Sequence, residues 1–318
     1  MRPAPSPPGA SGSAPHSGHV SVTASAIASR EELAEGRAVI GVGTGGSAAQ
    51  TMGLTLRQTA RTATLKSMAT SLRRLLRGEP IRFESDSEGR LAWLGRARRI
   101  PIHAVGSGPR LLAAAGRVGD GATMYASVDP DILRAGVACV AAGAGESRRE
   151  LADFDLAIRA PASVGRNRMV ARDHARGRVA SALRHPSPVP FRPEDAPGVE
   201  RLRREYDAFQ HATTLARHRE LVLDRLVDLM ALAGAPDEVR ETVRLVMTVP
   251  ELARFILLPQ VPDAGFGSRE PILTLFAEGG HGPRRVGPSS VAAERHLSAG
   301  RVGATRRAAT LYSRPPGY

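Results

Sequence analysis

The sequence predicts an α/β fold in which a parallel sheet is covered by crossover helices. Short apolar runs alternate with longer segments of helical periodicity between about residues 20 and 279, an alternation typical of successive β–α units. Two of the apolar runs end in glycine-rich turns that lead into helical patterns. With 318 residues and 42% apolar content, the chain can bury the core of one large domain or of two smaller ones.

Five short apolar segments are predicted to be strands of this sheet. They are residues 38–42, 101–105, 121–125, 154–160 and 255–258. Helical patterns cover residues 20–33, 109–116, 130–142 and 167–183, a stretch from Thr55 to Gly78, and one that begins at Pro236. Asp129 followed by Pro130 is typical of a capped helix start. Leu65, Met68, Leu72 and Leu75 share one face of their helix, which we expect to pack on the sheet.

Two glycine-rich turns are the strongest functional signal in the chain. The first contains Gly43, Thr44, Gly45 and Gly46, followed by Ser47, and the second contains Gly106, Ser107, Gly108 and Pro109. A glycine amide can approach an anion closely, and a helix start adds unpaired N–H groups and a positive dipole end. We therefore expect both turns to lie at the carboxyl ends of parallel strands and to bind a nucleotide-like cofactor.

Each turn also has a structural alternative. The first could be a tight turn that needs a positive φ, and the second could be a capping turn in which Ser107 satisfies free N–H groups of the next helix. We favour cofactor contact at both turns.

The two ends of the chain differ from its middle in composition. Residues 1–18 and 280–318 are rich in Pro, Gly and Ser and carry few large apolar groups, and the second also carries many Arg. Such segments bury too little surface to offset the entropy of ordering them, so both are predicted to be disordered tails. Residues 19–279 are predicted to form the domain, with a helical insertion at about residues 185–230.

Composition and charge argue against several classes of partner. The net charge is +13, but Lys66 is the only lysine among 44 basic residues, the arginines are scattered, and aromatic residues do not alternate with them. We therefore expect no nucleic-acid binding. No stretch approaches the roughly 18 apolar residues of a membrane span, and residues 1–18 lack the apolar run of a signal peptide. The expected location is the cytoplasm.

Cysteine and histidine content limits the chemistry further. Cys139 is the only cysteine, which excludes an internal disulfide and fits a reducing compartment. No His, Cys or carboxylate spacing indicates a metal site. His211, near Tyr206 and Phe209 in the insertion, could face a substrate, although a lone helical histidine is more often an ordinary surface or core residue. Gly106-Ser107-Gly108 is not a nucleophile elbow, so no catalytic residue is nominated.

Several stretches, taken in order, resemble the luciferase-like monooxygenase superfamily. They are residues 22–26, 36–45, 76–80, 101–103, 108–110, 115–116, 119–121 and 233–239. The similarity is to the flavin- or deazaflavin-dependent branch that includes methylenetetrahydromethanopterin reductase. This resemblance implies a (β/α)8 TIM barrel with a late insertion and with the cofactor at the carboxyl ends of the strands.

The resemblance also implies that part of the barrel is absent. The strand at residues 38–42 resembles the family's fourth, so we expect an N-terminally truncated barrel that lacks the first three strand–helix units and shows about five of eight strands. An unclosed sheet would expose unpaired edges and apolar interior, and we expect such a chain to be unstable alone.

The implied activity is that of an oxidoreductase using coenzyme F420, or alternatively FMN, for hydride transfer or monooxygenation of a small organic substrate. In the superfamily's sugar-phosphate dehydrogenases an acidic residue follows the Gly-Thr-Gly sequence, and Gly46 stands in that place here, which argues against that activity. Members commonly form dimers, so a homodimer is expected. The alternative is a non-catalytic barrel remnant, or a subunit that pairs with a full-length partner.

Overall fold

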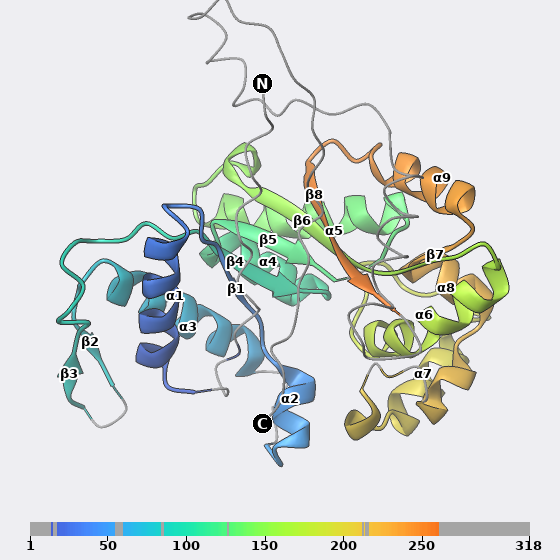
Figure 1. Cartoon of the computed structure of the whole chain (residues 1–318), viewed down its shortest axis with the longest axis horizontal. Helices are drawn as coiled ribbons and strands as arrows, with labels where there is room; N and C mark the ends of the chain where they lie inside the picture. Colours follow the sequence, from blue (N-terminus) through green and yellow to red (C-terminus); the bar gives the residue numbers. More distant parts are fainter. Residues whose placement is uncertain are drawn as a thin grey trace, which may run out of the picture.

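The computed structural model describes residues 14, 18–54, 60–83, 86–125, 127–211, 213 and 216–260. The predicted tails lie outside these residues apart from Ala14 and Gly18. In the described part, a parallel sheet forms a half-barrel with helices on its outer side (Figure 1), which confirms the predicted α/β class.

All strands of the half-barrel run parallel. In chain order they are β1 (Ile40–Val42), β4 (Ile102–Gly106), β5 (Gly121–Met124), β6 (Asp155–Val164), β7 (Leu232–Gly234) and β8 (Leu252–Pro259). Leu156 and Ile158 of β6 pair with both β5 and β8, so these two strands flank β6 on opposite sides. Within the described residues, β1, β7 and β8 each pair with a single neighbouring strand, β1 with β4 and the other two with β6.

The helices follow the predicted alternation closely. They are α1 (Val20–Leu33), α2 (Gly46–Thr51), α3 (Ala60–Leu76), α4 (Pro109–Val118), α5 (Pro130–Glu146), α6 (Arg168–Leu183), α7 (Ala196–Glu205), α8 (Asp224–Met230) and α9 (Pro236–Val246). Three short 3-10 turns, η1 (Leu151–Asp153), η2 (Ala208–Gln210) and η3 (Arg217–Leu221), and a hairpin of β2 (Ile81–Arg82) and β3 (Glu88–Gly89) complete the described elements. Asp129 caps α5 as predicted, accepting hydrogen bonds from the amides of Asp131 and Ile132.

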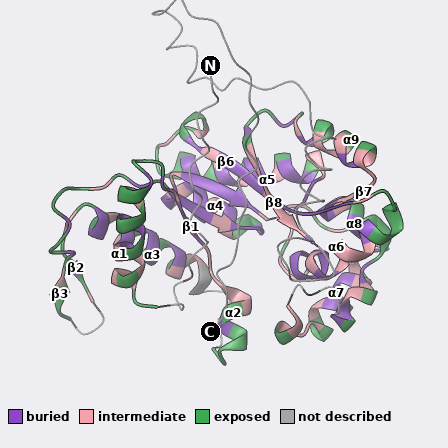
Figure 2. Ribbon diagram, in the orientation of Figure 1, coloured by how far each residue is buried: buried purple, intermediate pink, exposed green. Residues whose placement is uncertain are grey.

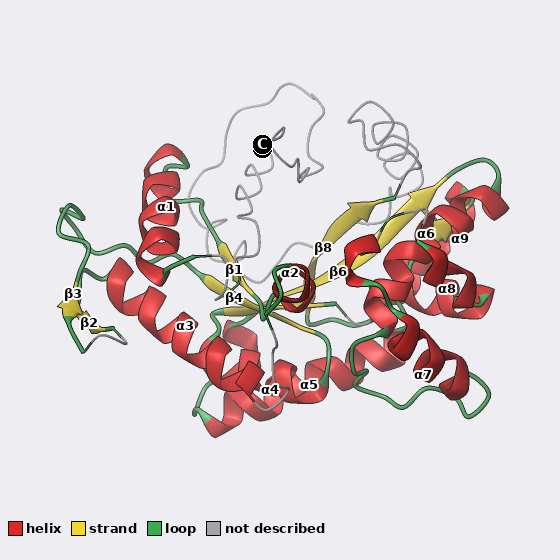
Figure 3. Cartoon of the chain, turned by 90° about the horizontal axis from the view of Figure 1, so that it is seen from below, coloured by secondary structure: helices red, strands yellow, loops and turns green. Residues whose placement is uncertain are grey.

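The strand register assigns alternate residues to the two faces of the sheet. One row contains Val42, Ala104, Ala122 and Leu156, all fully buried in the core shared with the helices. Helices α3, α4 and α5 lie along this side of the sheet (Figure 3). The neighbouring row contains Gly41, His103, Gly121 and Asp155 and therefore faces the inside of the half-barrel.

Burial follows the predicted pattern on the long helix α3. Leu65, Leu72 and Leu75 are completely buried and Met68 is 5% exposed, so this face packs into the core as expected. Buried residues concentrate on the sheet and on the inner sides of the helices (Figure 2). The described segments include no helix long and apolar enough to cross a membrane.

Four features of the sheet differ from the sequence prediction. β1 begins two residues later than expected, β6 continues four residues beyond Ala160, β8 begins three residues earlier than expected, and the three-residue strand β7 was not predicted. Ala162 pairs with both Leu232 of β7 and Pro259 of β8, which places β7 on the same side of β6 as β5. The absence of three strand–helix units stays a prediction.

Candidate functional site

The two glycine turns lie side by side at one rim of the half-barrel. Val42 pairs with Ala104 in parallel register, so Gly43 and the end of β4 at Gly106 leave the sheet at the same edge. A Cβ atom on Gly43 would lie 3.4 Å from the Val105 Cβ atom, an ordinary contact between neighbouring strands. The predicted position of both turns, at the carboxyl ends of adjacent parallel strands, is confirmed.

The first turn leads directly into the short helix α2. Gly45 is its N-cap residue, with a φ of 61° in the left-handed region that favours glycine. Gly46 and Ser47 form the first residues of the helix, and Gly43 to Ser47 are all half-buried. The structural explanation, a tight turn that needs a positive φ, therefore accounts for the glycine at position 45.

The second turn leads into α4 without a side-chain cap. Gly108 is the N-cap residue and its helix starts with Pro109, so the first intrahelical bond runs from the Leu112 amide to the Gly108 carbonyl at 3.0 Å. The amides of Arg110 and Leu111 precede that bond and have no partner within the helix. Ser107 is only 6% exposed, yet no hydrogen bond of its hydroxyl is found among the described residues. The capping role considered for Ser107 is therefore not observed.

Packing within the protein accounts for the two glycines of this turn. A Cβ atom on Gly106 would lie 2.9 Å from the Leu111 Cβ atom, and one on Gly108 would lie 2.8 Å from the Pro186 Cβ atom. Pro186 belongs to the entry of the insertion and covers Gly108 directly. What the second turn leaves for a ligand is the Ser107 hydroxyl and the first amides of α4.

The insertion between α6 and β7 brings His211 to the first turn. Its Nδ1 atom lies 3.1 Å from the Ser47 Oγ atom and 2.6 Å from the Tyr206 hydroxyl. Arg184, which follows α6, donates to the same Ser47 Oγ and, at 2.9 Å, to Oε1 of Gln50. The residue that the sequence suggested as facing substrate thus lies beside the predicted cofactor turn.

His211 is a neutral imidazole at physiological pH. Burial, followed by the positive charges of Arg178, Arg184 and Arg159, lowers the pKa of His211 to about 3. Burial also raises the pKa of Tyr206, so its phenol stays protonated. A neutral ring nitrogen with two hydroxyl groups beside it can accept or donate a hydrogen bond, and it carries no charge to stabilise a substrate anion.

A second polar group lies inside the half-barrel at the opposite, amino ends of the strands. The Nε2 atom of His103 lies 3.3 Å from Oδ2 of Asp155, reaching across the space left by Gly121. Arg254 of β8 donates through Nε to Asp155 Oδ1 at 3.0 Å. Burial by itself would raise the pKa of Asp155, but His103 and Arg254 together hold that pKa below its ordinary value. His103 points into the half-barrel and is paired there with Asp155.

The sequence analysis did not identify the arginines around His211. Arg159 is the only charged residue in the stretch 156–164 of β6, and a lone charge in a buried strand was the available signal. Arg178 and Arg184 gave none, because arginines are frequent throughout the chain. Their convergence depends on how α6 and the insertion pack.

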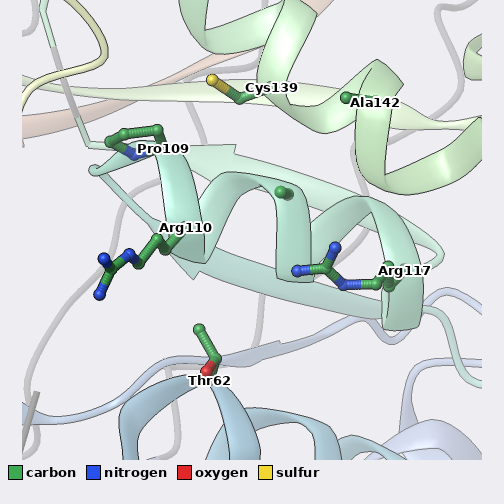
Figure 4. Close-up of a pocket in the computed structure, with 7 residues that line it drawn as sticks. Thr62, Pro109, Arg110, Arg117, Cys139 and Ala142 are labelled. Atoms are coloured by element: carbon green, nitrogen blue, oxygen red, sulfur yellow. The ribbon is translucent and has the colours of Figure 1, made fainter. Parts of the chain in front are cut away.

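The helix layer contains a separate cavity of about 400 Å³. It lies between α3, α4 and α5, and its walls include Thr62, Arg110, Arg117 and Cys139 (Figure 4). The cavity reaches Pro109 but no other residue of the glycine turns, so it lies on the outer side of the rim. In the described part of the chain, no cluster of three or more His, Cys, Asp or Glu residues could hold a metal ion.

Comparison with known proteins identifies the family. The chain is 27% identical to 5,10-methylenetetrahydromethanopterin reductase of Methanolobus tindarius over 240 residues, covering 74% of this chain and 72% of that one. It is 29% identical to the reductase of the same name from Archaeoglobus fulgidus, covering 71% and 69%.

A solved structure shares the fold. The coenzyme F420-dependent tetrahydromethanopterin reductase from Methanopyrus kandleri superposes with a TM-score of 0.64 at 19% identity, covering 86% of this chain and 81% of that one. The family model described as luciferase-like monooxygenase matches residues 9–248. With most of its length matched, the chain belongs to the luciferase-like monooxygenase family.

Proposed function

We propose that this protein binds coenzyme F420, with FMN as the alternative, at the rim formed by the two glycine turns. The proposed reaction is hydride transfer to or from a small organic substrate, or its monooxygenation. The observation that carries the proposal is the second turn, where the largely buried residue Ser107 and uncapped helix amides lie at the carboxyl end of a barrel strand. The similarity to methylenetetrahydromethanopterin reductases, together with the shared fold of the coenzyme F420-dependent reductase, supports the deazaflavin over the flavin.

The residues at the rim fit an anionic cofactor. Ser107 would donate its hydroxyl, and Arg110 and Leu111 would donate their amides, to a phosphate at the positive end of the α4 dipole. Thr44, Gly45 and Gly46 would contact the ring system next to them. The cofactor supplies the hydride chemistry, while the protein supplies binding, orientation and exclusion of water.

His211 and Ser47 are proposed to contact the substrate. They lie next to the first glycine turn, and the imidazole is held in its neutral form with the Tyr206 hydroxyl at 2.6 Å. In this state the side chains can orient a carbonyl or hydroxyl group of a substrate without adding charge. The proposal includes a homodimer in the cytoplasm, which sedimentation and cell fractionation would test.

Titration of the purified chain tests cofactor binding. Coenzyme F420 and FMN are each added to the wild type, to Ser107→Ala and to Ser147→Ala, a control serine at the C-terminal end of α5, and binding is followed by fluorescence. We expect Ser107→Ala to weaken binding about tenfold, the usual loss for a hydrogen bond to a charged group, and the control to bind like wild type. Absence of binding by the wild type would instead favour the non-catalytic remnant.

A further inference from the structure

The hydroxyl of Tyr206 decides which nitrogen of His211 carries the proton. The Tyr206 oxygen lies 2.6 Å from Nδ1 of His211. Hydroxyl donors make bonds of about 2.5–3.0 Å, whereas an N–H donor rarely comes closer to an oxygen than about 2.7 Å. Burial raises the pKa of Tyr206, so the phenol keeps its proton. Tyr206 is therefore the donor in this short bond, and Nδ1 of His211 is the acceptor.

This bond leaves the Nε2 side of the His211 ring as a donor. A neutral imidazole has one N–H group and one nitrogen with a lone pair, so a ring that accepts at Nδ1 carries its proton on Nε2. The Nε2 atom lies 3.4 Å from the Ser47 Oγ atom, which is longer than an ordinary N–H···O bond of at most about 3.2 Å. The Nε2–H group is thus only weakly satisfied within the described part of the chain.

Ser47 provides a second donor beside this one. Arg184 donates to the Ser47 Oγ atom, so the proton of the serine hydroxyl points elsewhere. Nδ1 of His211 lies 3.1 Å away, but its single lone pair already accepts the shorter bond from Tyr206. No other acceptor for the Ser47 hydroxyl is found among the described residues. Two donors, 3.4 Å apart, therefore lie beside the first glycine turn, close enough for one oxygen to bind both.

We propose that Tyr206 is a positioning residue that holds the His211 proton on Nε2, and that His211 and Ser47 together bind the carbonyl oxygen of the substrate. A carbonyl oxygen has two lone pairs and no proton, so it can accept from both donors at once. An ammonium group brings only donors, and Arg184 already uses one of the two lone pairs of Ser47. The positioning role follows from contacts within the protein, whereas the carbonyl substrate rests on the proposed oxidoreductase function.

Nitrogen NMR of the isotope-labelled full chain tests the positioning role without any ligand, and His211→Gln identifies the His211 signals by their loss. We expect wild type to show an unprotonated Nδ1 and a protonated Nε2. Tyr206→Phe removes only the hydroxyl, so its Nδ1 signal should move toward that of neutral histidine in water. Tyr125→Phe is the matched control, because the Tyr125 hydroxyl donates to the Arg178 carbonyl at 3.1 Å, and it should match wild type. A proton on Nδ1 in wild type, or an unchanged Nδ1 signal in Tyr206→Phe, would overturn the proposal.

Titration with cyclohexanone and with cyclohexylamine, at saturating coenzyme F420 or FMN, tests the substrate class. We expect the ketone to shift the Nε2 signal of His211 and the amine to leave it in place. Ser47→Ala should bind the ketone about fivefold more weakly, the usual loss for a hydrogen bond between neutral groups, and Ser147→Ala should bind it like wild type. An equal response to the amine, or no response to the ketone, would overturn the assignment to a carbonyl. Failure of both cofactors to bind would refute the proposed function, while the spectra of the free protein would still decide the role of Tyr206.

Discussion

The two ends of the strands differ in how their charges are satisfied inside the half-barrel. At the amino ends, Asp155 lies between His103 and Arg254, and each partner lies within direct contact distance. At the carboxyl ends, Arg159, Arg178 and Arg184 surround a neutral His211, and Arg159 and Arg184 contact tyrosine rings. The same sheet thus carries a paired carboxylate at its amino ends and a neutral histidine near arginines at its carboxyl ends.

This difference assigns separate roles to the two ends. A half-buried carboxylate with two cationic or hydrogen-bonding partners stabilises the fold. In barrel enzymes generally, the carboxyl face carries the chemistry and the amino face carries stability, and the cofactor site proposed for this protein lies on the carboxyl face.

The largest expected effect is at the amino end. Asp155→Ala would leave Arg254 and His103 without their shared partner, and we expect the free energy of unfolding in urea to fall by about 3 kcal/mol. Glu241→Ala breaks an exposed pair with Arg244 and should cost no more than about 0.5 kcal/mol. A loss for Asp155→Ala as small as that of this control would show that the network does not stabilise the fold. Cofactor affinity should be unchanged in both variants.

As the pH is lowered, the free energy of unfolding should fall first because of His211 at the carboxyl end and only later because of Asp155 at the amino end. The folded pKa of His211, about 3, lies below its ordinary value of 6.5, so the unfolded chain binds the extra proton and stability falls as pH drops below about 6.5. The slope approaches about 1.4 kcal/mol per pH unit at most. Asp155 has a folded pKa below 3.8, so the stability it provides is present above that pH and is lost only as pH falls through the folded value.

Urea unfolding of wild type and His211→Gln at pH 7 and pH 5 measures the contribution of His211, because Asp155 loses its contribution only at lower pH. We expect the variant to lose less stability than wild type between the two pH values, while His218, whose pKa burial also lowers, retains its own contribution. An identical pH slope in both proteins would contradict a buried neutral His211.

A smaller effect should distinguish the two glycine turns. Alanine at position 108 would place its Cβ atom 2.8 Å from the Pro186 side chain, whereas at position 43 the nearest atom is at 3.4 Å. We therefore expect Gly108→Ala to lower thermal stability by about 1–2 kcal/mol and Gly43→Ala to cost clearly less. Equal losses would mean that Pro186 can move away from the turn.

The smallest effect on stability should come from Ser107→Ala. Its hydroxyl forms no hydrogen bond among the described residues, so we expect a change within about 0.5 kcal/mol in urea unfolding. If this substitution destabilises the chain by more, the hydroxyl serves the fold and is less suited to hold a cofactor.

The fold was predictable where local signals and burial agree. The cap at Asp129, the apolar face of α3 and the start of α9 at Pro236 all appear as expected, because each depends on residues close in sequence. β7 was missed because three residues, Leu232 to Gly234, carry too little periodicity to separate a strand from the end of a helix.

The candidate site was predictable only in part, for the same reason. Glycine turns after apolar runs have a local signature, so the rim was placed correctly. His211 reaches Ser47 across 164 residues of chain, and Arg159, Arg178 and Arg184 converge only after β6, α6 and the insertion have packed. No spacing along the chain encodes such contacts.

A crystal structure of the chain with coenzyme F420 or FMN bound would test the central claim most directly. We predict the cofactor phosphate within hydrogen-bond distance of the Ser107 hydroxyl and the Arg110 and Leu111 amides, with the ring system against the turn from Gly43 to Gly46. A cofactor bound near His103 and Asp155, or in the helix-layer cavity beside Cys139, would contradict it.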